Sequence, residues 1–172
     1  MKKGVRGLST VVATLLLILL AMALVGIVWA VVTNLIEKEV EKTSCLDTIG
    51  EVGFTHQYVC YNASNGSELR FAISIGEVNI DAAVISVSAE GTTKGFKILA
   101  ENSTVSYVIP FNRNYAEVAL PAQNGGLSYL YNMSSAGFTG RPDSIQISPQ
   151  IGENVCDATD MITEIVNCYA LD

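Results

Sequence analysis

Four cysteines are the residues of this chain best suited to covalent chemistry: Cys45, Cys60, Cys156 and Cys168. All four follow a long apolar segment, and an even number of cysteines in an exported domain is typical of disulfides. Four cysteines allow three pairings. We favour Cys45 with Cys60 and Cys156 with Cys168, because short loops are the easiest to close. A zinc site is the competing interpretation, but the sequence lacks the Cys-x-x-Cys spacing of a zinc knuckle.

The remaining polar residues give little indication of a catalytic or metal centre. His56 is the single histidine, has no evident partner that could act with it in acid–base catalysis, and is typical of an ordinary strand histidine. Asp157 and Asp160 could approach a cation, although two acidic residues in a loop usually face solvent. Glycine-containing runs indicate turns rather than a phosphate-binding loop, at Asn124-Gly-Gly, Gly91 and Gly95. We therefore expect no enzyme activity, no cofactor and no metal.

Four Asn-x-Ser/Thr sequences are candidate N-glycosylation sites: Asn62, Asn65, Asn102 and Asn132. The motif often arises by chance in a sequence rich in Ser and Asn. Because all four lie after the apolar segment, together they indicate a glycosylated exported surface.

The long apolar segment near the N-terminus precedes all the residues considered so far. No charged side chain occurs from Gly7 to Ile36, and the run from Val11 to Val32 is apolar except for Thr14. About 20 such residues cross a bilayer as a helix. A helix buried in a globular core normally keeps a polar stripe, and this segment has none. We predict one transmembrane helix.

The charges on either side of this helix predict its orientation. Lys2, Lys3 and Arg6 precede it, so the N-terminus is expected to stay in the cytoplasm. The chain from Glu37 onward carries all 17 acidic residues and only seven of the ten Lys and Arg residues, a difference of ten negative charges. Nucleic acid is therefore not expected as a partner, since phosphate binding needs a basic patch.

The exported part alternates with the period of a β-strand. One predicted strand places Arg70, Ala72 and Ser74 on one face and these side chains on the other: Leu69, Phe71, Ile73 and Ile75. The same alternation occurs at Val105, Tyr107, Ile109 and Phe111, and at Ala116, Val118 and Leu120. A change of phase between Val78 and Ser88 indicates a bulge near Ala82.

These patterns predict an α+β fold, in which a long N-terminal apolar helix precedes a small antiparallel β-sheet or β-sandwich domain. Turn residues separate the strands, as at Asn-Arg-Asn 112–114. The last stretch suits either a strand or a short helix, through Ile162, Ile165, Val166 and Tyr169.

The start of the chain carries the most specific pattern. Arg6-Gly7 is followed by Leu-Ser-Thr-Val-Val-Ala-Thr-Leu-Leu-Leu-Ile-Leu-Leu-Ala, which resembles the class III signal and helix of archaeal type IV pilins. The resemblance implies that a prepilin-peptidase-like enzyme cuts between Gly7 and Leu8, with Gly4 as a second candidate, and leaves the helix on the mature protein. Archaellins usually open with a Gly-rich, Phe-containing run, which this chain lacks, so we rank pilins first.

The resemblance also implies a domain organisation and a function. Residues 1–7 would be a cleaved leader, 8–43 the transmembrane and filament-core helix, and 44–172 an extracellular β-rich domain with disulfides. The membrane-anchored precursor would become a subunit of a cell-surface filament for adhesion, a helical homopolymer built by membrane assembly machinery. Small residues would let neighbouring helices pack closely, at Ala21, Ala23, Gly26 and Ala30.

Two other functions remain open. One is a monomeric, signal-anchored surface protein or a minor pilin-like component, which predicts an uncut leader or no self-assembly. The other is a membrane-tethered β-domain that binds a small ligand. Its pocket would use the aromatic residues Tyr107, Tyr129 and Tyr131, although such residues on alternate strand positions are more often packing.

Overall fold

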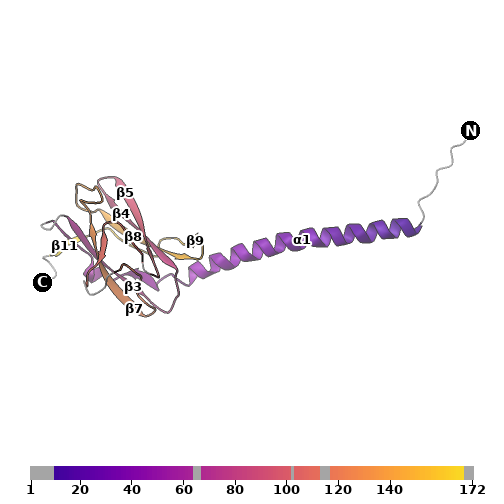
Figure 1. Cartoon of the computed structure of the whole chain (residues 1–172), viewed down its shortest axis with the longest axis horizontal. Coiled ribbons are helices and arrows are strands. Elements are labelled where there is room, and N and C mark those ends of the chain that lie inside the picture. Colours follow the sequence, from indigo (N-terminus) through magenta and orange to yellow (C-terminus); the bar gives the residue numbers. More distant parts are fainter. Residues whose placement is uncertain (1–9, 64–66, 102, 113–116, 169–172) are drawn as a thin grey trace, which may run out of the picture. The chain divides into compact units, whose positions relative to one another are not determined.

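The computed structural model describes residues 10–63, 67–101, 103–112 and 117–168 (Figure 1). The chain divides into two compact units, Met1–Val40 and Glu41–Asp172. The first contains most of a single long helix, α1 (Thr10–Leu46), and the second contains all the strands.

Helix α1 is longer than the apolar segment from which it was predicted. Its 37 residues include no proline, and Gly26 is its only glycine, so nothing in the sequence interrupts it. The helix continues through the charged residues that follow Ile36 and ends at Leu46, one residue beyond Cys45. The last turn of α1 therefore belongs to the β-rich unit.

The strands form two sheets. The first sheet has the order β11-β2-β3-β7-β6, and β1 pairs with the other half of β3. Its strands are β1 (Val52–Phe54), β2 (Cys60–Asn62), β3 (Glu68–Ile75), β6 (Val108–Pro110), β7 (Gly125–Asn132) and β11 (Val166–Asn167). Neighbouring strands are antiparallel, except that β11 runs parallel to β2.

The second sheet has the order β10-β8-β4-β5, with β9 paired to β8. All its pairs are antiparallel. Its strands are β4 (Ala82–Ala89), β5 (Thr92–Leu99), β8 (Ser144–Ile151), β9 (Asn154–Val155) and β10 (Asp160–Ile162).

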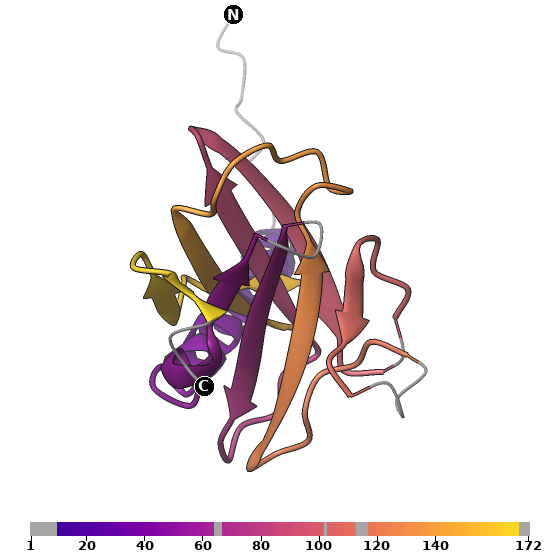
Figure 2. The same ribbon diagram turned by 90° about the vertical axis from the view of Figure 1, so that its left-hand side faces the viewer.

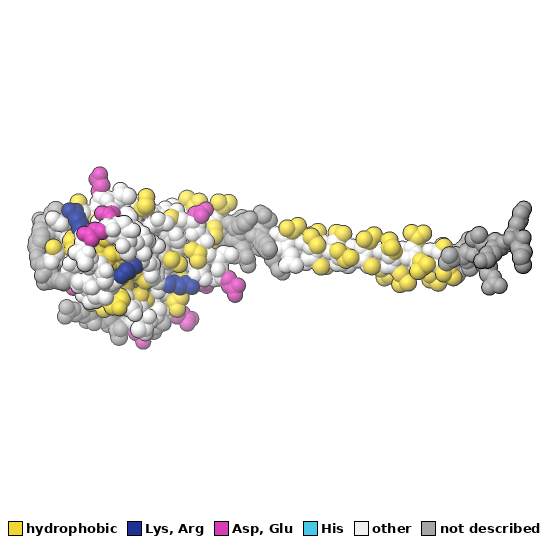
Figure 3. Space-filling view, turned by 90° about the horizontal axis from the view of Figure 1, so that it is seen from above, with side chains coloured by type: hydrophobic (Ala, Val, Ile, Leu, Met, Phe, Trp, Pro, Cys, Tyr) yellow, Lys and Arg dark blue, Asp and Glu magenta, His cyan; other side chains and the backbone are white. Residues whose placement is uncertain are grey.

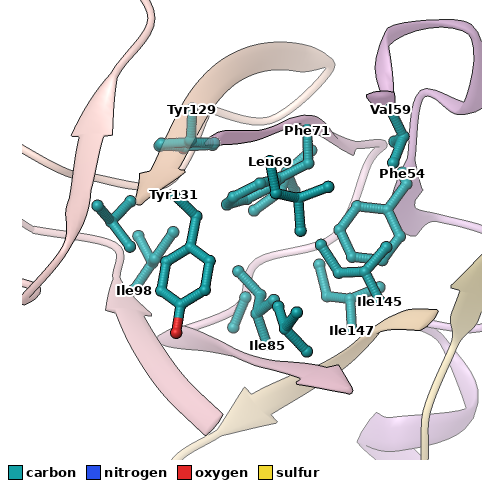
Figure 4. Packing of buried hydrophobic residues seen from close by; sticks show 14 of the residues in the cluster. Phe54, Val59, Leu69, Phe71, Ile85, Ile98, Tyr129, Tyr131, Ile145 and Ile147 are labelled. Atoms are coloured by element: carbon teal, nitrogen blue, oxygen red, sulfur yellow. The ribbon is translucent and has the colours of Figure 1, made fainter. Parts of the chain in front are cut away.

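The two sheets lie face to face and enclose one hydrophobic core (Figure 2). Phe71 on β3 stacks on Tyr129 of β7, with ring centroids 5.3 Å apart. Phe96 on β5 stacks on Tyr131 of β7 at 4.9 Å and so joins the two sheets. Aliphatic side chains fill the space around these rings, among them Leu69, Ile85, Ile98, Ile145 and Ile147 (Figure 4). The domain is therefore a β-sandwich, and the predicted α+β fold class is confirmed.

The predicted alternation is correct along β3 and along β4, where Ala83, Ile85 and Val87 are fully buried, but the predicted bulge is wrong. Leu69, Phe71 and Ile73 are fully buried in the core, as expected. No bulge occurs near Ala82, because β4 begins at that residue and pairs continuously with β8 from Ala82 to Ser88. Val78 and Ile80 belong to the connection before the strand, so the change of phase marks the beginning of β4.

The strand predicted over residues 105–111 shrinks to the three residues of β6, and its phase is reversed. Val108 is buried, whereas Ile109 and Phe111 are 50% and 48% exposed. Tyr107 has a φ of 67°, a left-handed conformation that shifts the alternation by one residue.

The strand predicted at residues 116–120 is not a regular strand, although two of its predicted inward residues are buried. Val118 and Leu120 are buried. Val118 forms only an isolated bridge with Ser103. Ala116 and part of the turn predicted at 112–114 lie outside the described residues.

Turns occur at two of the three predicted glycine positions. Glu90 and Gly91 connect β4 to β5 and have φ values of 50° and 75°, as in a two-residue type I′ hairpin. Gly95 is instead inside β5, opposite Ser86. Asn124 has a φ of 54° and leads into β7.

The last part of the chain is extended in the described residues up to 168. Ile162 ends β10, and both Ile162 and Ile165 are buried. Strand β11 begins at Val166 and pairs with β2. Tyr169 lies outside the described residues.

The favoured disulfide pairing is wrong. Cys45 is bonded to Cys156 and Cys60 to Cys168, across sequence separations of 111 and 108 residues. The reason is the parallel pairing of β11 with β2, which places Val166 opposite Cys60 and so carries Cys168 to the same edge of the first sheet. Both bonds join the beginning of the β-rich unit to its end.

Replacing Cys60 and Cys168 together by alanine should lower the free energy of unfolding by about 2–5 kcal/mol, because the bond restricts the unfolded chain over a long loop. Thermal unfolding followed by circular dichroism measures the change, and the Cys45, Cys156 double variant is the matched comparison. A peptide map without reductant that links Cys45 to Cys60 would contradict the structure.

Replacing Tyr129 by phenylalanine should lower the free energy of unfolding by about 1 kcal/mol. The buried Tyr129 hydroxyl donates a hydrogen bond to the carbonyl oxygen of Ala119 at 2.6 Å. Urea unfolding measures the loss. The same substitution at Tyr107, which is 52% exposed, should change little, and equal losses at the two positions would show that this hydrogen bond contributes nothing.

Candidate functional site

The apolar part of α1, Val12–Ile36, is the largest surface feature of the described chain. It is long and apolar enough to cross a membrane, and its apolar core is not buried against any other described part of the chain. Leu17, Met22 and Ile27 are each more than 60% exposed, and 100° per residue places them on three different sides of the helix. Hydrophobic side chains cover the visible face of this segment (Figure 3). The segment therefore has no polar side that could face water.

The polar side chains at its C-terminal end bond to the helix itself. Thr33 donates to the carbonyl oxygens of Trp29 and Ala30 at 3.1 and 3.2 Å. Asn34 donates to the carbonyl oxygen of Ala30 at 3.3 Å. Polar groups satisfied within the helix cost less in an apolar environment than unpaired ones. Both residues are therefore compatible with lipid or with a dry helix interface.

Three of the four small residues predicted for helix packing share one face. At 100° per residue, Ala23, Gly26 and Ala30 fall within about 60° of one another around the axis. Ala21 projects from the opposite side. A Cβ added at Gly26 would meet no atom within 4 Å, so the glycine is not required by contacts inside the described structure. A close approach of another helix would explain a glycine here.

The predicted leader site lies outside the described residues, as do two of the glycosylation candidates. Gly4, Gly7 and Leu8 precede residue 10, and Asn65 and Asn102 fall in other gaps of the description.

The two described glycosylation candidates differ in accessibility. Asn62 is only 8% exposed, so its side chain would have to turn outward to carry a glycan. Asn132 is half-buried, and its side-chain oxygen accepts hydrogen bonds from the Ser135 backbone at 2.8 Å and the Ser134 hydroxyl at 3.0 Å. Both amides are held by the fold, which makes either one a less accessible acceptor than its motif implies.

His56 has a carboxylate partner that the sequence did not reveal. It lies in a short 3₁₀-helix, η1 (His56–Tyr58), and its Nε2 is 3.1 Å from Oδ2 of Asp160 on β10. That same oxygen accepts a hydrogen bond from the Phe54 backbone at 2.8 Å. The expectation that His56 is a strand histidine without a partner is wrong, because folding brings residues 104 positions apart together. Since the His56 side chain is 67% exposed, the pair resembles a surface contact between η1 and β10.

Asp157 and Asp160 do not form a cation site with other residues that the structure describes. Asp160 is occupied by Phe54 and His56, and no group of three potential metal ligands occurs among the described side chains.

The three tyrosines proposed for a ligand pocket do not share one, although Tyr107 and Tyr131 both border a hollow beside β5. Tyr129 and Tyr131 are buried in the core, while Tyr107 is exposed. Burial raises the pKa of the Tyr129 hydroxyl far above its usual value. Burial, and to a lesser extent the nearby Tyr107, also raises the pKa of Tyr131. Both core tyrosines are therefore neutral packing residues.

A second hollow, of about 350 Å³, lies on the outer face of the first sheet and is bordered by Tyr129. Its polar and aromatic lining includes Gln57, Tyr58, Arg70, Phe111 and Ser128. The alternation of β3 placed Arg70 on this face correctly, but no pattern in the sequence brings Phe111 to it, because Phe111 follows β6 and strand β7 lies between β6 and β3.

Comparison of the chain with protein-family models, with curated proteins and with solved structures finds no match in any of the three. What can be stated about location therefore rests on the chain itself. The apolar helix indicates a membrane anchor or signal segment, and the two disulfides indicate a domain outside the cytoplasm.

Replacing Leu24 by arginine should impair membrane association, since a charge at the centre of a membrane helix costs about 3 kcal/mol. The measurement is the fraction of the full chain that resists extraction by alkaline carbonate. The same substitution at Leu46, which lies in α1 beyond the apolar segment, is the control and should have no effect. Equal extraction of both variants and the unaltered chain would rule out a membrane-spanning α1.

Proposed function

We propose that this protein is a structural subunit of an extracellular, archaeal type IV pilus-like filament that serves adhesion or surface contact. In this proposal α1 anchors the precursor in the membrane and later forms the filament core with copies of itself. The β-sandwich forms the outer surface.

The observation that carries the proposal is the exposure of α1 on every side. A helix that is apolar all round is stable in lipid, and it is equally stable in a water-free bundle of identical helices. Transfer from lipid to such a bundle gains little hydrophobic energy, so close packing must favour it. The face formed by Ala23, Gly26 and Ala30 supplies the small residues that allow helices to approach closely.

The β-rich unit has properties that suit an exposed sheath. Its two disulfides tie both ends of the domain together and favour persistence outside the cell. The exported part of the chain is acidic, which limits non-specific association between domains that are crowded on one surface. Cys45, in the final turn of α1, is bonded to Cys156 within the β-rich unit.

Removal of the leader gives the proposal a physical switch. Lys2, Lys3 and Arg6 hold the N-terminus on the cytoplasmic side of the membrane. Cleavage after Gly7 would delete these charges and allow the helix to leave the bilayer during assembly. A monomeric anchored protein has no need of this step.

Replacing Gly7 by valine should block processing, because the resemblance places glycine immediately before the cut bond. The unaltered chain should yield sheared filaments whose subunits begin at Leu8, as measured by intact mass and N-terminal sequencing. The Gly7 variant should remain in the membrane fraction with its leader attached.

The same substitution at Gly4 is the matched control and should leave processing and filaments unchanged. If the unaltered chain keeps Met1 and is found only in the membrane fraction, the protein is a signal-anchored surface protein instead. Cleavage that is lost in the Gly4 variant alone would move the site to that glycine.

A further inference from the structure

The hollow on the outer face of the first sheet arises from an interruption in the edge of that sheet. Strand β1 pairs with residues 73–75 of β3, and β2 pairs with residues 68–70. Between them the chain leaves the sheet as η1, which carries Gln57 and Tyr58. The space left beside β3 is the hollow, and the Cys60–Cys168 disulfide contributes to its lining.

The opposite wall is positioned by a backbone hydrogen bond. The Phe111 N–H donates to the carbonyl oxygen of Ser128 on β7 at 2.8 Å. This bond extends the β6–β7 pairing by one residue and places the Phe111 ring over the sheet. Phe111 and Tyr58 are 48% and 58% exposed, so both aromatic side chains are accessible from solvent.

Arg70 lies in this hollow without a counterion among the residues that the structure describes. Its guanidinium carbon is 5.0 Å from the centroid of the Phe111 ring, and its Nε is buried without a hydrogen-bond partner. Among the described residues Arg70 forms no ion pair, although Glu68 projects from the same face of β3. A partly desolvated guanidinium without an anion is costly, and a carboxylate placed against it would be bound by charge-assisted hydrogen bonds.

The other described cations differ from Arg70. Arg141 donates a hydrogen bond to the carbonyl oxygen of Ile165, and Lys94 donates to that of Ala136. Each therefore holds two segments of the domain together. Lys97 is exposed on β5 and borders a separate hollow. Among the cations whose side chains the structure describes, Arg70 combines a buried Nε that lacks a partner with an aromatic ring against its guanidinium.

We propose that this hollow binds a sugar carboxylate of the size of a hexuronate residue. The carboxylate pairs with the terminal nitrogens of Arg70, and the sugar ring lies against Tyr58 and Phe111. The hydroxyl of Ser128 and the amide of Gln57 supply hydrogen bonds that suit a hydroxyl-bearing ring better than a plain hydrocarbon acid. The volume is at the lower end of the range for small-molecule sites. This site is independent of filament assembly.

The test is calorimetric titration of the full chain in detergent micelles with glucuronate and, as the neutral control, glucose. Glucuronate should bind and glucose should bind at least about tenfold more weakly, since only the former can pair with Arg70. Raising the salt concentration should weaken the binding of glucuronate. Equal affinity for the two sugars, or no binding of glucuronate, would overturn the proposal.

Arg70→Gln should weaken glucuronate binding by about tenfold or more, and Arg70→Lys should restore only part of it, because lysine cannot form the paired bonds of a guanidinium. Lys97→Gln removes the same charge elsewhere and should bind glucuronate normally. Phe111→Ala should weaken the binding of both sugars, although it leaves the charge of the hollow unchanged. Unfolding temperatures identify any variant that is misfolded. If one variant is misfolded, the binding of glucuronate by the other Arg70 or Phe111 variants decides whether the hollow is the binding site.

Equal losses in the Arg70 and Lys97 variants would show only a general charge effect and would reject the site. Tighter binding of an acidic peptide than of glucuronate would reject the sugar as ligand. The Arg70 variants should still be processed and recovered in filaments, so failure of this proposal is distinguishable from failure of the proposed function.

Discussion

The need to keep α1 away from water is the constraint on which the rest of the molecule depends. A helix of this length with apolar side chains on every side satisfies its own backbone hydrogen bonds, so it can reside in lipid or among other helices. It cannot be covered by the small β-sandwich, whose hydrophobic side chains are already used between its own two sheets. The chain therefore has two units that require different surroundings, an apolar one for α1 and water for the β-sandwich. Any function must accommodate both.

The β-sandwich meets a different demand, because it must stay folded around a small core outside the cytoplasm. Strand β3 is central to it: β7 pairs along its whole length, while β1 and β2 share its other edge. Phe71 on β3 contacts the rings of Phe54, Phe96 and Tyr129, so one side chain joins several strands. The disulfides then close the two ends of the domain, which reduces the freedom of the unfolded chain.

The hollow at Arg70 arises from the same edge of β3. Where β1 and β2 fail to meet, η1 leaves the sheet, and its residues Gln57 and Tyr58 form a wall of the hollow beside Arg70. A continuous edge strand would have left Arg70 as an ordinary surface side chain. Irregular backbone beside a rigid sheet is where binding residues commonly occur. The interruption thus gives the domain a chemical feature that an all-regular sandwich would lack.

The sequence alone determined the features that depend on local periodicity. The uncharged run fixed the helix, and alternation fixed the buried face of β3 at Leu69, Phe71 and Ile73, because a period of two is imposed by the strand itself. Tertiary structure decided which strands became neighbours. The Cys60–Cys168 bond, the contact of His56 with Asp160 and the meeting of Arg70 with Phe111 all follow from that choice. Residues far apart in sequence carry no local signal of their pairing, and at Tyr107 a single left-handed residue was enough to reverse the predicted phase of β6.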